Sequence, residues 1–211
     1  MEDVLDVYHR PYNPDCPVIC LDECSKELHS TPRRELAAEP GIARRQDYEY
    51  ERQGTCNIFC WVEPLVGRRG VRVTPRRTAV DFAEQLRLLV DEADPDARQI
   101  VLITDNLNTH HLGALYERFA HDEARRIAQR LEWHYTPEHA SWLNMAEIEI
   151  NVLSSQALKQ RIPTEDQMAA IVKAWQTGRN RRQEKIVWKF TVKDARKKFK
   201  YEPYYPTKLK K

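Results

Sequence analysis

The segment Gln99-Ile100-Val101-Leu102-Ile103-Thr104-Asp105 is the stretch from which the fold can be inferred. A short unbroken apolar run that ends at an acid is typical of a central strand, buried on both faces of a sheet. Sheets with such strands are usually parallel and covered by helices. We therefore expect an α/β domain with Asp105 at the carboxyl edge, the edge at which open α/β sheets bind ligands.

Strand and helix patterns alternate on both sides of this segment. Thr78 and Asp81 have the spacing of a capping box, which predicts the start of a helix. Pro163 separates two later apolar stretches with helical spacing. The expected elements are helices over 78–93, 112–131, 141–160 and 164–182, and a further strand over 131–135.

Three more strands are predicted in the first third of the chain. Residues 17–23 form an apolar run that ends at Asp22 and Glu23, residues 55–62 are β-branched and aromatic, and residues 71–74 alternate. The last two are expected to pair as an antiparallel hairpin. Together the elements predict a central five-stranded mixed sheet, parallel in its later part and flanked by helices.

The composition is that of a globular protein. The chain has 211 residues, of which 41% are hydrophobic and 31% charged, which excludes a disordered chain, a collagen and a coiled coil. No apolar run approaches the roughly 20 residues of a membrane span, and the acidic start is unlike a signal peptide. Five cysteines, an odd number, favour the reducing cytoplasm as the location.

Charge is distributed unevenly along the chain. The segment from Arg179 to Lys211 contains 13 basic and three acidic residues, so it carries +10, and the rest of the chain carries −8. A basic segment of this kind either binds a polyanion through phosphate contacts or is a solvated helix surface. The acidic body is able to gather several carboxylates at one place.

Three carboxylates are candidates for such a group. Asp22 and Asp105 end predicted strands, although a lone acid there is more often a turn former. Asn144, Glu147 and Asn151 share one face of the predicted helix, and the neighbours of that face are apolar.

A glutamate in apolar surroundings is costly to bury unless it is paired or binds a metal. We expect the nearby Glu149 to be the exposed alternative. Asp22, Asp105 and Glu147 would suit a hard divalent cation, and two such ions could serve phosphoryl transfer.

The sequence resembles the catalytic domain of bacterial insertion-sequence transposases related to the mariner superfamily. Several motifs in order carry the resemblance, and the strongest runs from His134-Tyr135-Thr136-Pro137 through Ser141-Trp142-Leu143-Asn144 to Glu147. The others are Leu21-Asp22-Glu23, Tyr48-Glu49-Tyr50 to Gly54-Thr55, Asn57-Ile58-Phe59 to Glu63-Pro64-Leu65, Arg76-Arg77-Thr78, Asp81-Phe82-Ala83, Thr104-Asp105-Asn106-Leu107-Asn108-Thr109-His110, Trp188-Lys189-Phe190-Thr191 and Asp194-Ala195-Arg196.

This resemblance implies a ribonuclease H-like fold and a transposase. Asp22, Asp105 and Glu147 would be the catalytic triad and hold two Mg²⁺ or Mn²⁺ ions. The reaction would be DNA cleavage followed by strand transfer, carried out by a homodimer on paired transposon ends and target DNA. Supporting residues would be Glu23, Asn106, His110 and Asn144, and DNA-binding residues would be Arg181, Arg182, Arg196, Lys197, Lys198 and Lys200.

The predicted organisation is an irregular N-terminal arm over 1–16, a catalytic domain over 17–183 and a basic segment over 184–211. Residues 29–47 are expected to be a loop. The relatives carry helix-turn-helix modules before the catalytic domain, and the 21 residues before Asp22 are too few for one. The chain is therefore expected to be a catalytic half.

Two other functions stay open: an inactive remnant that binds DNA, and a nuclease that cuts without joining. The Cys-x-x-x-Cys pairs Cys20/Cys24 and Cys56/Cys60 could in principle bind zinc. Because they fall on predicted strands, we interpret them as small buried apolar residues.

Overall fold

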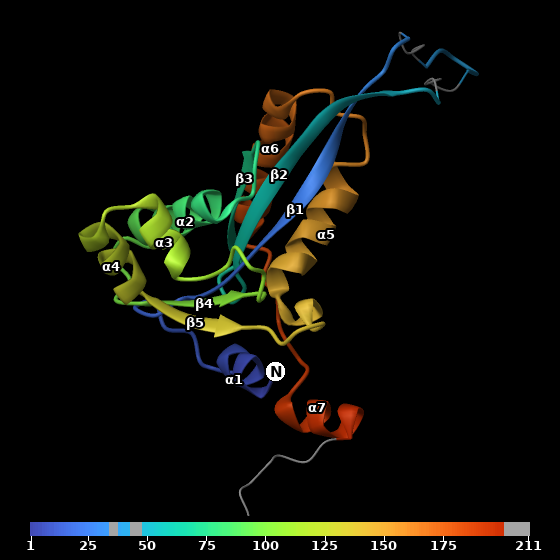
Figure 1. The fold of residues 1–211 in the computed structure, drawn as a ribbon. Coiled ribbons are helices and arrows are strands. Elements are labelled where there is room, and N and C mark those ends of the chain that lie inside the picture. The colour runs from blue at the N-terminus through green and yellow to red at the C-terminus, as the bar shows by residue number, and fades with distance from the viewer. Residues whose placement is uncertain (34–37, 43–47, 201–211) are drawn as a thin grey trace, which may run out of the picture.

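The computed structural model describes residues 1–33, 38–42 and 48–200 (Figure 1). Its centre is a five-stranded mixed sheet with the strand order β3-β2-β1-β4-β5. β2 and β3 form the predicted antiparallel hairpin, and β4 and β5 pair parallel, as predicted for the later part of the sheet. β1 joins the two parts, antiparallel to β2 and parallel to β4. The strands are β1 (Val18–Ser30), β2 (Glu51–Glu63), β3 (Arg68–Thr74), β4 (Ile100–Thr104) and β5 (Leu131–Tyr135).

β1 is much longer than the predicted strand, and Asp22 lies within it rather than at its end. The expectation that Asp22 ends the first strand is therefore wrong. The reason is non-local: β1 pairs with β4 only as far as Cys20, but pairs with β2 through Ser30. Beyond Cys20 the two strands continue between α5 and α6, and their far end projects past these helices (Figure 1). The first two residues of the predicted loop over 29–47, His29 and Ser30, belong instead to β1, and part of that loop lies outside the described residues.

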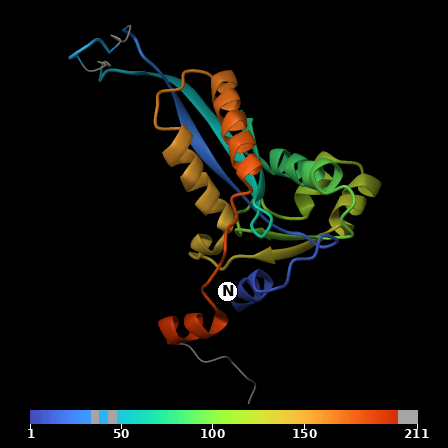
Figure 2. The same ribbon diagram turned by 180° about the vertical axis from the view of Figure 1, so that it is seen from behind.

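Helices cover both faces of the sheet (Figures 1 and 2). The odd-numbered side chains of β1, such as Ile19 and Leu21, pack with the first group of helices, and even-numbered ones such as Leu28 pack with the second. This alternation follows from the two-residue period of a strand. The first group is α2 (Ala79–Leu88), continued by a π-helix (Leu89–Ala93), α3 (Gly113–Arg118) and α4 (His121–Gln129), and the second is α5 (Met145–Ala157) and α6 (Glu165–Arg182).

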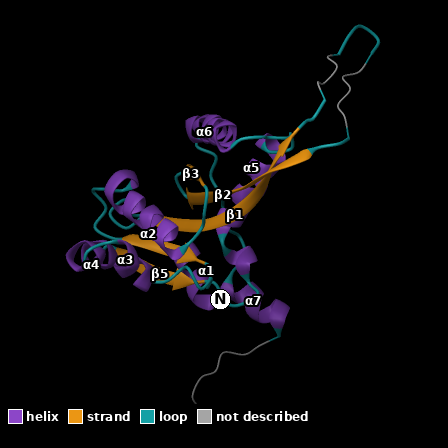
Figure 3. Cartoon of the chain, turned by 45° about the horizontal axis from the view of Figure 1, so that its top comes forward, coloured by secondary structure: helices purple, strands orange, loops and turns teal. Residues whose placement is uncertain are grey.

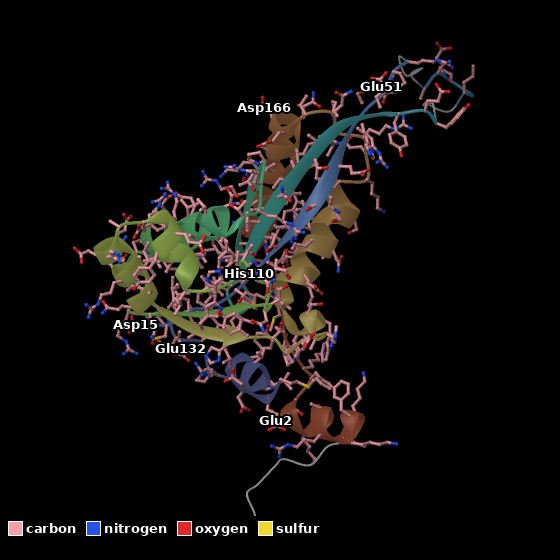
Figure 4. All side chains as sticks on the ribbon, viewed as in Figure 1. Glu2, Asp15, Glu51, His110, Glu132 and Asp166 are labelled. Atoms are coloured by element: carbon pink, nitrogen blue, oxygen red, sulfur yellow. The ribbon has the colours of Figure 1, made fainter. Side chains whose placement is uncertain are left out.

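Two helices were not predicted, α1 (Glu2–Tyr8) and α7 (Val192–Phe199). Val4 and Leu5 of α1 are fully buried, so the expectation of an irregular arm over 1–16 is wrong for its first half. A helix this short is held by tertiary packing rather than by propensity, which is why its sequence gives a weak signal. Glu2 pairs with Arg196 of α7, and α7 lies beside α1 (Figures 3 and 4).

α6 covers the outer edge of the sheet at β3. The side-chain amide of Asn180 accepts a hydrogen bond from the backbone N–H of Arg69 at 3.0 Å and donates one to its carbonyl at 2.8 Å. One turn earlier, Gln176 accepts from the N–H of Val71 at 2.8 Å. These amides take the place that a sixth strand would fill. In the part of the chain that the structure describes, no helix has the length and apolarity needed to cross a membrane.

Candidate active site

Two aspartates lie at the carboxyl edge of β4. Asp105 follows Thr104, the last residue of β4, as predicted. Asp22 lies two residues beyond Cys20, the last residue of β1 that pairs with β4. Asp22 therefore reaches the same edge although it lies within a strand, because its parallel partner has already ended.

Asp22 is a buried carboxylate among other carboxylates. It is 7% exposed. Burial raises its pKa to about 7, and the negative charges of Asp105, Glu23 and Glu147 act in the same direction, opposed by a hydrogen bond from the backbone N–H of Glu23. All three predicted triad residues thus interact electrostatically at one site.

Glu147 lies in the first turn of α5, the helix after the fifth strand, as predicted. α5 begins at Met145, not at Ser141, because residues Ser141–Leu143 form a separate 3-10 turn. Asn144 caps α5 by accepting the N–H of Ala146, and its amide donates to Asp22 Oδ2 at 3.3 Å. Glu147 is half-buried, and the predicted companion Asn151 is exposed.

His110 links Asp105 to Glu23. Its Nδ1 lies 2.5 Å from Asp105 Oδ1 and its Nε2 lies 2.9 Å from Glu23 Oε2, while its ring stacks on Phe82. Burial lowers the pKa of His110, but the two carboxylates outweigh it and raise that pKa to about 9. Burial likewise raises the pKa of Asp105, and His110 lowers it below its usual value. His110 is therefore a buried cation between two acids. Figure 4 labels its position near the centre of the molecule.

An open cavity of about 400 Å³ adjoins Asp105. The predicted Asn106 is exposed and belongs to its lining. His139, on the loop before α5, has a left-handed backbone with φ of 59°, which is uncommon for a residue other than glycine. The lining residues are Asp105, Asn106, Leu107, Thr136, Pro137, Glu138, His139 and Ser141.

The donor set fits a hard divalent cation. Asp22, Asp105 and Glu147 offer carboxylate oxygens, which Mg²⁺ and Mn²⁺ prefer, and Asp22 has a raised pKa because it is buried close to other carboxylates, an arrangement that a cation would stabilise. Within the described ranges, no three His, Cys, Asp or Glu side chains already form a ligand set around one point. Mutual repulsion of carboxylates and the pairing of Asp105 with His110 both oppose such an arrangement without a cation.

Glu149 is not the exposed residue that the sequence predicted. Its side chain is fully buried and lies 3.1 Å from Arg69 of β3 and 2.8 Å from Arg179 of α6. Sequence reasoning missed this triad because both arginines are distant in the chain and Arg179 was counted in the basic segment. The one signal in the sequence that could have indicated this cluster is the position of Glu149 among apolar residues of the predicted helix.

The predicted DNA-binding residues fall into two groups. Arg181, Arg182, Lys197, Lys198 and Lys200 are exposed at the end of α6 and along α7. Arg182 pairs with Glu184 at 2.9 Å. Arg196 instead makes two hydrogen bonds to Glu2, at 2.8 and 2.6 Å, so it joins α7 to α1.

Three of the four cysteines of the Cys-x-x-x-Cys pairs are small buried apolar residues, as interpreted from the sequence. These are Cys20, Cys56 and Cys60, whereas Cys24 is half-buried; all five cysteines are free thiols. Burial raises the pKa of Cys20 to about 12, so its thiol stays protonated at neutral pH.

Comparison with known proteins identifies the family of the chain. The family model of the DDE superfamily endonuclease matches residues 17–169. Two solved structures share the fold: the Mos1 mariner paired end complex with Mn, at 17% identity and a TM-score of 0.53, and the Mos1 strand transfer complex, at 15% and 0.51. Each alignment covers 87% of this chain, which spans 55% and 57% of those chains. Comparison with curated proteins finds no significant match.

The fold is thus that of a ribonuclease H-like α/β domain. The chain belongs to the DDE superfamily of endonucleases.

Proposed function

We propose that this chain is the catalytic domain of a transposase that cleaves DNA and joins the cut end to a target. The observation that carries the proposal is the desolvated carboxylate of Asp22, within electrostatic range of Asp105 and Glu147 at one sheet edge. Family membership supports it, since the matched region contains all three residues. The proposed partners are transposon ends and target DNA, bound by a homodimer in the cytoplasm, at the nucleoid.

Asp22, Asp105 and Glu147 would hold two Mg²⁺ or Mn²⁺ ions, which supply electrophilic stabilisation of the phosphate oxygens. The chain's own groups do the rest. Asn144 restrains Asp22, and His110 restrains Asp105 by binding one of its oxygens. In the first step water attacks a phosphodiester and releases a 3′-hydroxyl. In the second that hydroxyl attacks a target phosphodiester, so that one P–O bond forms as another breaks.

The exposed basic residues of α6 and α7 would bind the DNA backbone. Arg181, Lys197, Lys198 and Lys200 can contribute phosphate contacts, and Arg196 would hold α7 in place. This division of roles gives the acidic site a basic neighbour that attracts DNA.

The test is a strand-transfer assay on a pre-cleaved transposon end, with Asp22→Asn as the control variant. Wild type should nick and join only with Mg²⁺ or Mn²⁺, and Asp22→Asn should do neither while keeping its melting temperature. Cutting without joining would indicate a nuclease, and neither activity an inactive remnant.

Binding of the cation is a separate readout. Mn²⁺ should raise the melting temperature of wild type, because a ligand that binds the folded state stabilises it. It should raise that of Asp22→Asn much less. Equal shifts in the two proteins would contradict the assignment of Asp22.

A further inference from the structure

A cluster of aromatic side chains joins the turn before α5 to α7. Trp142 and Trp188 stack with ring centres 6.2 Å apart, and Phe190 and Phe199 approach Trp142 at 5.9 and 6.4 Å. Trp142 remains 41% exposed and Phe199 45% exposed. Two large rings are therefore half open to solvent in a chain that buries most of its apolar side chains.

Positive charge surrounds these rings. The ammonium group of Lys198 lies 5.8 Å from the ring centre of Phe190, and the exposed Lys200 directly follows Phe199. The one acid of α7, Asp194, is engaged in the capping box at the start of the helix. The open aromatic surface thus carries net positive charge, which favours an anionic partner with flat apolar groups.

The cluster begins at the carboxylate site. Ser141, directly before Trp142, lines the cavity beside Asp105, and Asn144, two residues later, donates to Asp22. Trp142 therefore lies between two residues that adjoin the carboxylate site, and a DNA strand bound at the carboxylates would pass close to it.

We propose that Trp142 and Phe199 form a stacking platform for an unpaired base of the DNA strand that enters the carboxylate site. The inference rests on the proposed function and adds the form of its substrate. Stacking needs a free base face, and paired bases inside a duplex do not offer one. The platform would therefore hold the strand where it is unpaired or ends, while Lys198 and Lys200 bind its phosphates.

The experiment measures binding without catalysis, by fluorescence anisotropy in EDTA. The probes are a labelled oligothymidylate and a blunt duplex of equal charge. Trp142→Ala should weaken oligothymidylate binding about tenfold, as expected for one stacked base, and leave duplex binding within about twofold. Trp142→Phe should keep most of the affinity. Tyr116→Ala is the matched control, because Tyr116 is 46% exposed on α3 over the other face of the sheet.

If Trp142→Ala does not fold, Trp142→Leu takes its place. Leucine keeps much of the apolar volume of the side chain but has no aromatic face. Equal losses on both probes, or no loss, would overturn the platform. The platform would also be overturned if the Trp142 variants changed only the oligomeric state of the protein, because the aromatic cluster would then be an interface between copies of the chain. Failure of wild type to nick DNA, with Trp142-dependent binding intact, would overturn the proposed function and leave the platform standing.

Discussion

Asn144 and Asp22 are joined across the interface between α5 and β1, where the Nδ2 of Asn144 donates to Asp22 Oδ2 at 3.3 Å and to the carbonyl of Leu21 at 2.9 Å. The Oδ1 of the same amide caps α5 at the N–H of Ala146. One fully buried side chain therefore fixes the start of the helix that carries Glu147 to the strand that carries Asp22.

Asn144→Ala should reduce both stability and cleavage. It removes a helix cap and leaves the carbonyl of Leu21 without its side-chain donor, which together cost about 2–4 kcal/mol. Urea unfolding measures the first effect and plasmid nicking the second. Thr164→Ala, which removes the exposed cap of α6, should cost about 1 kcal/mol and leave nicking unchanged. An Asn144→Ala protein that nicks normally would show that the contact with Asp22 is dispensable.

His110→Phe should keep the stacking on Phe82 but remove the cation between Asp105 and Glu23. Glu23 keeps its pair with Arg77 and Asp105 keeps the N–H of Leu107, so the loss of His110 should cost about 1–3 kcal/mol in unfolding free energy. Loss of the group that orients Asp105 should slow nicking about 10–100-fold. His134 offers a matched control.

His134 also lies between two acids, Asp3 at 2.7 Å and Glu132 at 2.9 Å, but these are more exposed and belong to the far side of β5. His134→Phe should cost about 1 kcal/mol or less and leave nicking intact. Equal effects of the two substitutions on nicking would contradict a special role for His110.

Glu149→Gln should destabilise the protein strongly. It leaves two buried guanidinium groups without their carboxylate, a change that costs about 3–5 kcal/mol. Replacing the whole triad, as Arg69→Met/Glu149→Leu/Arg179→Met, should restore much of the loss, because an apolar set of similar volume avoids the desolvation penalty. Chemical denaturation compares the two variants.

The triple variant also tests whether the buried cluster of Arg69, Glu149 and Arg179 sets the rotation of α5 about its own axis. Glu147 and Glu149 are two residues apart, so they point about 200° apart around the helix axis. With the triad gone we expect a stable protein whose nicking is slower by about tenfold or more. Normal nicking by a stable triple variant would show that this buried charge cluster contributes to stability only. The control is Glu63→Gln, which removes the carboxylate that pairs with the partly exposed Arg68 and should leave nicking unchanged.

Replacing Lys197, Lys198 and Lys200 with alanine should weaken duplex binding and flatten its salt dependence. Each lost phosphate contact lowers the slope of log affinity against log salt by about 0.9. Arg125→Ala/Lys173→Ala, exposed on α4 and α6, should leave the slope unchanged. Deleting 196–211 is a poorer test, because the cut falls inside α7 and removes the pair between Arg196 and Glu2. An unchanged slope would make α7 a solvated surface.

Local patterns were enough to place Asp105 and Glu147. An apolar run before an acid and a helix pattern after a strand each depend on nearby residues only. Asp22 was assigned to the correct edge but to the wrong position in its strand, because the length of β1 depends on pairing with β2, whose paired residues lie 21 to 42 positions away in the chain.

The rest required contacts between distant parts of the chain. Glu149 lies on the same helix as Glu147, and its burial depends on arginines 80 and 30 residues away. α1 is held by packing against α7, which lies at the other end of the chain. A pattern search over neighbouring residues therefore never contains both helices. Periodicity reports which face of an element is apolar, but not which charged residues find a buried partner.

The amides of Gln176 and Asn180 along β3 have a consequence for assembly. Strand addition needs an edge whose backbone groups are free to pair with another chain. At Arg69 and Val71 those groups are already bound by α6, so no neighbouring copy can extend the sheet there. Polymerisation by edge-to-edge pairing, the common hazard of an open sheet, is blocked at this side by two side chains of one helix.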